Sequence, residues 1–344
     1  MPEFDLIQRY FTRATPGAEL GVGDDAALLR VAPGMELAVS TDMLVEGTHF
    51  FADADPRLLG HKTLAVNLSD MAAMGARPRW ALLSLSMPAE QGAWLQAFSD
   101  GFFALAAQHG VDLVGGDTTR GPRNLCVTIM GEVPRGAALR RSGARAGDDI
   151  WVSGTLGEAA LGLAHLQGRV HLPAPAYAAC VRRLHQPEPR VALGLALHGL
   201  AHSAIDISDG LLADLGHILE CSGVGARLEL AALPVPNLLR GALQSTAGEG
   251  AGEGAGEGAG EGAGAGEGAP DRELALHCAL AGGDDYELCF TAAPAMREGV
   301  GRLATQLDLP LQRIGTIVAG AGCELRAPDG AIVQTKETGY DHFA

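Results

Sequence analysis

The chain has 344 residues, of which 47% are hydrophobic and 19% are charged, and its formal net charge is −16. A chain of this length accommodates two globular domains, each with its own core. The negative charge disfavours a nucleic acid partner but permits a small phosphorylated ligand, because bound metal ions can reverse the charge of a site.

Strands and helices alternate through the first part of the chain. Apolar periodicity predicts strands at 36–44, 79–88, 111–116 and 124–134, and helices at 56–75 and 90–110. The first strand is expected to end in Ser40, Thr41 and Asp42, and Asp117 follows the third strand. We assign residues 1–139 to a first α/β domain.

Residues 140–344 are assigned to a second α/β domain. It is predicted to contain strands near 150–154, 204–207, 226–230, 286–291 and 311–317, and helices near 156–167, 189–200 and 209–221. Residues 246–270 repeat a unit of Gly, Glu and Ala that offers nothing to bury, so we expect a flexible surface insert whose deletion leaves the fold intact. The whole pattern predicts an α/β fold of the α+β type, with two domains and mixed sheets.

The sequence carries no targeting signal that we recognise. The N-terminal residues MPEFDLIQRYF are acidic where a signal peptide is basic, and no run of about 18 apolar residues predicts a membrane span. The six cysteines contain no C-x-x-C pair, which favours reduced, packed cysteines. We therefore expect a cytoplasmic protein without a membrane segment.

Common catalytic motifs are absent from the sequence. It contains no G-x-x-x-x-G-K-[ST] phosphate loop, so a bound nucleotide has to be held in another way. It also contains neither a G-x-S-x-G elbow nor an H-E-x-x-H motif, which disfavours a serine hydrolase and a zinc peptidase.

Six aspartates stand in glycine-rich turns, at the ends of apolar segments or among apolar helical residues: Asp25, Asp42, Asp70, Asp117, Asp206 and Asp209. Carboxylates are the hard oxygen ligands that Mg²⁺ prefers, and several ions bridged by a polyphosphate would use the whole set. A structural role stays open for single members, because Asp209 can cap the helix at 209–221 and Asp25 can stabilise a turn. Asp70 has no capping task in mid-helix, which favours a functional role.

Gly-Asp-Asp occurs three times, at 23–25, 147–149 and 283–285. Adjacent carboxylates repel each other by roughly 1 kcal/mol in water and by more where they are buried, so each pair needs a physical explanation. Asp25 in the first pair belongs to the aspartate set above. For the second pair, Asp148 and Asp149, we expect a solvated turn that leads into a strand.

Nine motifs connect the chain with a known family, and they span nearly its whole length apart from the insert. In chain order they are GVGDDAALL, STDMLVEGTHF, HKTLAVNLSDMAAMGARP, LVGGDTTRG, TIMGEVP, RRSGARAGD, IDISDGLLADLGHI, GGDDYELCF and GYDHF. The chain thereby resembles the thiamine-monophosphate kinases, whose superfamily also contains aminoimidazole ribonucleotide synthetase and selenophosphate synthetase. This resemblance implies a two-domain ATP-binding fold without a phosphate loop, a homodimer in which the N-terminal sheets pair, and ATP-dependent phosphorylation of thiamine monophosphate to thiamine diphosphate.

The resemblance also implies roles for individual residues. The ligands of several Mg²⁺ ions would be the six aspartates, Asp25, Asp42, Asp70, Asp117, Asp206 and Asp209, with oxygens from Ser40 and Thr41. ATP would be bound in a cleft between the domains by Gly116, Asp117, Arg141 and Ser208, and thiamine monophosphate would be bound by His49, Asp284 and Tyr340. Where the family has glutamate in GGEDYEL, this chain has Asp284, which is one methylene shorter.

The implied mechanism is a direct in-line transfer of the phosphoryl group. Asp70 and Asp117 would act by holding metal, and Arg141 by pairing with phosphate. Since the attacking phosphate oxygen is already ionised at neutral pH, no strong general base is needed.

Two alternative functions stay open, namely another enzyme of the same superfamily and a non-catalytic nucleotide or metal sensor. The first cysteine is Cys126 and the sequence ends in GYDHFA, which disfavours selenophosphate synthesis and hydrogenase maturation. The complete set of aspartates disfavours a sensor, because a binding module tolerates the loss of several. His49 can also be a loop histidine with satisfied hydrogen bonds, and Tyr340 a packing residue near the C-terminus.

Overall fold

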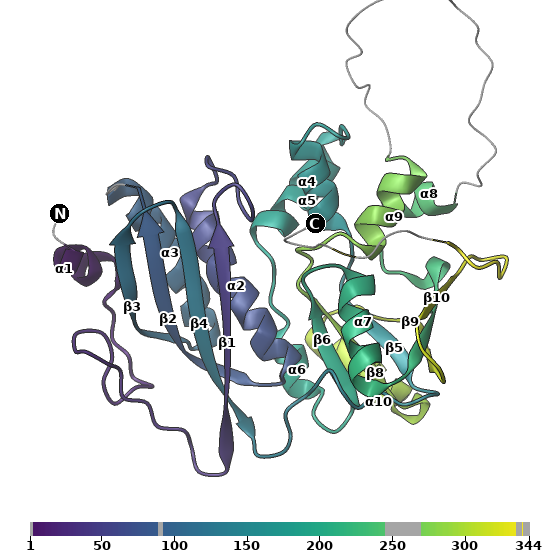
Figure 1. The fold of residues 1–344 in the computed structure, drawn as a ribbon, viewed down its shortest axis with the longest axis horizontal. Helices are drawn as coiled ribbons and strands as arrows, with labels where there is room; N and C mark the ends of the chain where they lie inside the picture. Colours follow the sequence, from purple (N-terminus) through teal and green to yellow (C-terminus); the bar gives the residue numbers. More distant parts are fainter. Residues whose placement is uncertain (1–2, 89–91, 245–269, 335–338, 340–344) are drawn as a thin grey trace, which may run out of the picture.

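The computed structural model describes residues 3–88, 92–244, 270–334 and 339. Two mixed β-sheets stand side by side, with helices packed between and around them (Figure 1). The predicted α/β fold with mixed sheets is confirmed, whereas the division into domains at residue 139 stays a prediction. Of the predicted insert, residues 246–269 lie outside the described residues. No helix in the described part of the chain has both the length and the apolar composition needed to cross a membrane.

The first sheet has the strand order β1-β4-β2-β3. Strand β4 pairs antiparallel with β1 and with β2, and β3 lies parallel to β2 at the far edge. Helices α2 and α3 cover one face of this sheet (Figure 1). The bounds of these elements are β1 Met35–Val45, α2 Pro56–Ala73, β2 Arg77–Met87, α3 Gly92–His109, β3 Asp112–Arg120 and β4 Asn124–Pro134, preceded by α1 Glu3–Leu6 and a π-helix at Ile7–Phe11.

The second sheet has the strand order β10-β7-β9-β5-β8-β6, in which only β10 and β7 run parallel. Its strands are β5 Asp149–Ser153, β6 Ser203–Ile207, β7 Gly225–Glu229, β8 Glu287–Ala292, β9 Leu311–Val318 and β10 Cys323–Arg326. The helices around it are α4 Glu158–Leu166, α5 Ala174–His185, α6 Val191–Ala196, α7 Leu211–Ser222, α8 Asn237–Gln244, α9 Arg272–Leu280 and α10 Arg297–Leu307, with short 3₁₀ turns at Leu230–Ala232 and Pro294–Met296.

Helix α2 is the central element, since it contacts β1 and β4 of the first sheet and β6 and β8 of the second. Its start follows from the sequence, because the Asp55 side chain accepts the backbone N–H groups of Arg57 and Leu58 and Pro56 occupies the first turn. Helix α3 approaches it very closely. A Cβ atom added at Gly60 would lie 2.1 Å from the carbonyl oxygen of Phe98, so only glycine permits this packing.

Two strands continue past the polar residues that were expected to end them. Strand β1 continues through Asp42 to Val45, and β3 continues through Asp117 to Arg120. The polar residues were expected to mark strand ends, but they form the regular ladder with β4 and β2. Successive side chains of a strand point to opposite faces, so the side chain of Thr41 lies on the other face from those of Ser40 and Asp42.

The second Gly-Asp-Asp is not a solvated turn, and that expectation was wrong. Asp148 and Asp149 are only 3% and 1% exposed. Asp148 accepts the Arg145 backbone N–H at 2.9 Å and lies 2.8 Å from Nδ1 of His202. Asp149 accepts two hydrogen bonds from Arg297, at 2.6 and 2.8 Å. Both carboxylates are therefore buried and paired, which removes the repulsion that suggested exposure.

Candidate active site

Two consecutive residues of α2 connect the two sheets. The Ser40 hydroxyl of β1 donates a hydrogen bond to Asp70 at 2.5 Å. The Ser69 hydroxyl donates to Asp206 of β6 at 2.7 Å. One turn earlier, Asn67 accepts the backbone N–H of Asp42 at 3.2 Å. Four of the predicted site residues, Ser40, Asp42, Asp70 and Asp206, thus gather around the C-terminal half of α2.

The carboxyl groups of this cluster repel each other. Burial, followed by the charges of Asp70 and Asp209, raises the pKa of Asp42 to about 7. Burial and then the charge of Asp70 raise the pKa of Asp206 to about 8. The pKa of Asp70 is also raised by burial, against the opposing effects of the Ser40 hydrogen bond and of the Arg141 charge. Asp209 and Arg141 therefore belong to the same electrostatic neighbourhood.

Asp209 does not cap α7, because the residue that precedes this helix is Gly210. The loop at 208–210 is instead held by Asp214, whose carboxylate accepts the backbone N–H groups of Ser208, Asp209 and Gly210 at 3.0 to 3.1 Å. Burial and the charge of Asp209 raise the pKa of Asp214 to about 7. Asp214 was not among the predicted site residues, although it stands in the first turn of α7, where an acidic residue is a recognisable signal.

Other predicted ligands lie outside this cluster. Asp25 is exposed, and its backbone N–H donates to the Asp24 carboxylate at 2.9 Å, as in a turn. The Thr41 hydroxyl donates to the carbonyl oxygen of Val127 at 3.0 Å, which directs it along the sheet. Asp117 is exposed on β3, next to Gly116, where an added Cβ would lie 1.8 Å from a backbone oxygen. Within the described ranges, no group of three His, Cys, Asp or Glu side chains is arranged to hold a metal ion as it stands.

The third Gly-Asp-Asp, at 283–285, contacts helix α2 of the first part of the chain. Asp284 forms a 2.9 Å ion pair with Lys62 of α2, a lysine that is only 3% exposed and that the sequence analysis did not select. Tyr286 is buried as well. Its pKa is raised by burial and then by the charges of Asp284, Asp42 and Asp206, so the three carboxylates belong to its electrostatic surroundings.

The remaining predicted substrate residues are less informative. Nδ1 of His49 accepts the backbone N–H of Val45 at 3.0 Å, so one ring nitrogen has the local role of a loop histidine. Tyr340 lies outside the described residues.

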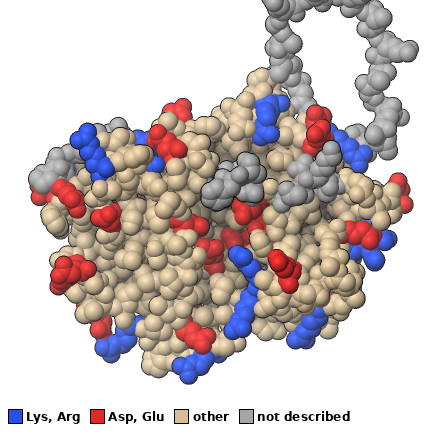
Figure 2. Space-filling model, in the orientation of Figure 1, with Lys and Arg blue, Asp and Glu red and all other residues tan. Residues whose placement is uncertain are grey.

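Acidic side chains gather in the middle of the molecular face that Figure 2 shows, where the two halves meet, and basic side chains lie beside them. A separate hollow of about 450 Å³ lies near the C-terminal end of α7, between Gly216, Glu220 and Cys323. We place the candidate site at the junction, because it unites buried carboxylates from both halves with Arg141 and Lys62.

Known proteins align with this chain over nearly its whole length. The model of the AIR synthase related protein N-terminal domain matches residues 23–133, and that of the C-terminal domain matches residues 145–327. The chain is 44% identical to the thiamine-monophosphate kinase of Escherichia coli K12, covering 99% of this chain and 98% of that protein. It is 39% identical to the corresponding kinase of Haemophilus influenzae, covering 100% and 98%.

Solved structures agree with these sequence matches. The thiamine-monophosphate kinase of Stenotrophomonas maltophilia K279a superposes with a TM-score of 0.78 at 47% identity, covering 96% of both chains. The structure of AaThiL complexed with AMPPCP and TMP gives a TM-score of 0.72 at 28% identity, covering 98% of this chain and 96% of that one.

Proposed function

The chain belongs to the AIR synthase related proteins and, within them, to the thiamine-monophosphate kinases, and on this premise we propose that it transfers the γ-phosphate of ATP to thiamine monophosphate, giving thiamine diphosphate and ADP. The observation that carries the proposal is the aspartate cluster that α2 assembles from both sheets, next to Arg141. The complex of the related AaThiL with AMPPCP and TMP supports the proposed binding of ATP and of thiamine monophosphate as the phosphate acceptor. We also propose that the protein acts in the cytoplasm, because its co-substrate ATP is available there.

We assign Mg²⁺ to this cluster, with Asp42, Asp70 and Asp206 as its main ligands and Asp209 beside them. The fit is supported by the chemistry of the donors. Burial and then the charge of Asp70 raise the pKa of Asp42 to about 7 and of Asp206 to about 8, and a cation would relieve the repulsion among these carboxylates. Mg²⁺ commonly takes one or two carboxylates and completes its shell with water and phosphate oxygens, so a tight group of three is not required. Bound there, Mg²⁺ would neutralise charge on the polyphosphate.

The residues of the chain would contribute mainly by orientation. The Ser40 hydroxyl fixes one oxygen of Asp70, and Asp214 fixes the backbone of the loop that carries Ser208 and Asp209. Arg141 is exposed, so its guanidinium can pair with a phosphate of ATP. The acceptor phosphate carries its own negative charge, and the transfer consists of bringing its oxygen in line with the γ-phosphorus atom.

The roles of Asp25, Asp117, Gly116 and Ser208 in binding metal and ATP, and of His49, Asp284 and Tyr340 in binding thiamine monophosphate, belong to the same proposal. Asp25 and Asp117 are exposed and would complete their contacts only when the polyphosphate is bound. Asp284, paired with Lys62 at 2.9 Å, is a carboxylate that could face the cationic thiazolium ring.

We also propose a homodimer that forms through the first sheet. Strand β1 lies at the edge of this sheet, and Leu37, Val39 and Met43 on one of its faces are 44%, 56% and 52% exposed. A row of exposed apolar residues on an edge strand is typical of a surface that a second copy covers. Light scattering tests this, since Val39→Glu should convert a dimer into a monomer, and a monomeric unmodified protein would contradict it.

An assay of both products tests the function. With ATP, Mg²⁺ and thiamine monophosphate, we expect thiamine diphosphate, measured as its fluorescent thiochrome derivative, in amounts equal to ADP. Thiamine, which lacks the acceptor phosphate, should give no diphosphate. Binding of ATP with Mg²⁺ but without formation of thiamine diphosphate would contradict the kinase assignment and favour the sensor.

A further inference from the structure

The segment 283–287, which carries Asp284, has an unusual backbone. Asp284 and Tyr286 have φ angles of 67° and 49°, in the left-handed region that disfavours residues other than glycine by roughly 1 kcal/mol or more each. Their N–H groups donate to the carbonyl oxygens of Ser208 and Ile207 at 2.9 and 2.8 Å. Such a conformation persists only where the surroundings hold it in place.

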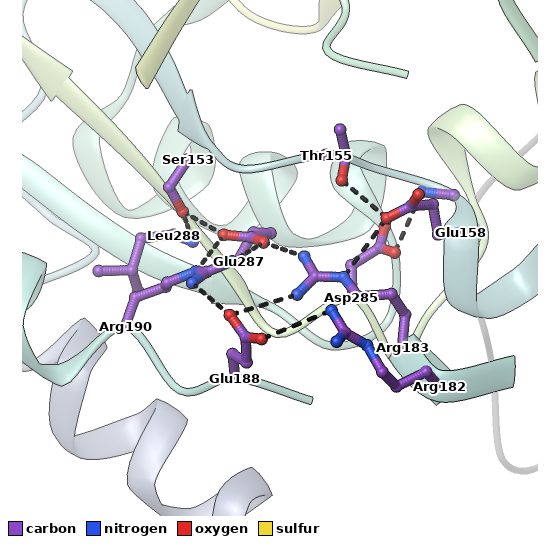
Figure 3. Close-up of polar contacts among 11 residues, drawn as sticks. Ser153, Thr155, Glu158, Arg182, Arg183, Glu188, Arg190, Asp285, Glu287 and Leu288 are labelled. Carbon is purple, nitrogen blue, oxygen red and sulfur yellow. Dashed lines mark hydrogen bonds and ion pairs between the residues drawn. The ribbon is translucent and has the colours of Figure 1, made fainter. Parts of the chain in front are cut away.

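One anchor of this segment is Glu287, which is fully buried at the start of β8. Its carboxylate accepts two hydrogen bonds from Arg190, at 2.5 and 2.7 Å, one from the Ser153 hydroxyl at 2.6 Å, and one from Arg183 (Figure 3). The carboxylate lies close against the backbone of Gly154, since a Cβ atom added there would lie 2.0 Å from a Glu287 oxygen.

The second anchor is Asp285, on the other side of Tyr286. Its buried carboxyl group accepts the Gly157 backbone N–H, with oxygens at 2.8 and 3.0 Å. Gly157 precedes α4, and Glu158 of that helix lies 3.4 Å from Arg183. The two anchors therefore share one connected set of contacts, and Figure 3 shows Asp285 and Glu287 pointing into it.

We call Ser153, Arg183, Arg190, Asp285 and Glu287 the anchor cluster. Buried ion pairs are weak devices for stability, because removing the charges from water offsets much of their attraction. They are better suited to fixing one conformation among several. Here the two anchors flank Tyr286 and directly follow Asp284, whose side chain pairs with Lys62. Only one methylene joins the Asp284 carboxylate to its backbone, so the position of the backbone largely sets the position of the charge.

We propose that the anchor cluster positions Asp284 for thiamine monophosphate, and that Arg183, Arg190, Asp285 and Glu287 are positioning residues that act through it. The inference rests on the proposed function, in which Asp284 contacts this substrate. It predicts that disturbing Glu287 weakens the binding of thiamine monophosphate without changing the binding of ATP.

The test variant is Glu287→Gln, which keeps the shape of the side chain and removes its charge. We expect the KM and the calorimetric Kd for thiamine monophosphate to rise about tenfold, as for the loss of a charged hydrogen-bonding partner, with an unchanged KM for ATP. Asp149→Asn is the matched control. Asp149 is equally buried, also contacts two arginines, and lies at the opposite end of the strand pair β5 and β8. The Asp149→Asn variant should have a lower Tm but an unchanged KM for thiamine monophosphate and for ATP.

A double-mutant cycle distinguishes positioning from general loosening. If Glu287 acts through Asp284, then Glu287→Gln should have no further effect on the Kd once Asp284→Asn is present. Additive effects, or an equal rise in KM for Asp149→Asn, would overturn the proposal. Arg190→Lys, which keeps the charge but loses the two-pronged contact, provides the same comparison if Glu287→Gln does not fold. An unmodified protein that forms no thiamine diphosphate would refute the proposed function instead.

Discussion

Replacing Asp70 by asparagine should separate catalysis from stability. Asparagine has nearly the same volume, and its oxygen can still accept the 2.5 Å hydrogen bond from Ser40. What the change removes is the negative charge at the centre of the cluster. We expect turnover to fall about a hundredfold or more, as for other groups that stabilise transferring charge, while the metal-free protein becomes more stable.

The gain in stability follows from the neighbours of Asp70. Its charge contributes more than any other to the raised pKa values of Asp42, about 7, and Asp206, about 8. A carboxyl group with a raised pKa binds protons more tightly in the folded state, so the free energy of unfolding declines as pH rises from 3.8 to the raised value. Removing Asp70 reduces this decline. One pKa unit corresponds to about 1.4 kcal/mol, so a gain on the order of 1 kcal/mol is expected at neutral pH.

Two measurements check the prediction for Asp70. The product assay gives turnover, and urea unfolding in the presence of a chelator gives the free energy of the metal-free protein. Asp112→Asn is a suitable control, because Asp112 is an aspartate outside the cluster. Its carboxylate accepts the backbone N–H of Gly17 at a distance of 2.6 Å. Normal turnover of the Asp70 variant would refute a role in catalysis. Lost turnover together with lost stability would assign Asp70 a structural role instead.

Three further predictions concern charge and the insert. Mg²⁺ should raise Tm more at pH 8 than at pH 6. Protons compete with the metal for carboxyl groups whose pKa values are about 7 in Asp42 and about 8 in Asp206. An equal rise in Tm at both pH values would contradict this. Asp149→Asn should lower Tm by a few degrees in a thermal melt, because it breaks the buried pair with Arg297, and an unchanged Tm would count against that pairing. Deletion of 246–270 should preserve the far-UV circular dichroism spectrum and kcat, and an unfolded product would show that the segment is required.

Periodicity predicted the elements whose buried faces are apolar. Helix α2 and strand β4 begin within a residue of the expected positions, because their apolar residues pack against one core. Helices α5, α8, α9 and α10 were not predicted. In α5 the buried apolar residues Cys180 and Leu184 stand beside Arg183, whose partner Glu287 lies 104 residues away, so a charged residue belongs to the buried side of this helix. A charged face can be recognised as buried only when its partner is known.

The candidate site could be predicted in outline for a similar reason. The aspartates of the motifs include Asp42, Asp70 and Asp206, and α2 brings these three together. Their role in binding metal stays a prediction. Lys62 and Asp214 were missed. Lys62 stands in an apolar helical stretch that gives no sign of its ion pair with Asp284, and Asp214 contacts only backbone N–H groups. The Lys62 contact depends on a tertiary arrangement that no local pattern encodes, whereas Asp214 holds a neighbouring loop and stands in the first turn of α7, where an acidic residue is a local signal.

Two pairs of buried carboxylates in this chain differ in the charge of their surroundings. Asp149 and Glu287 each contact two arginines, so their charge is compensated inside the protein. Asp42 and Asp206 are buried beside other carboxylates, and their pKa values are raised by burial and then by those charges. Folding alone is opposed by such crowding, whereas a bound cation would relieve it. The cluster around Asp70, where several buried carboxylates lie together, is therefore the place where a positively charged ligand is expected to bind.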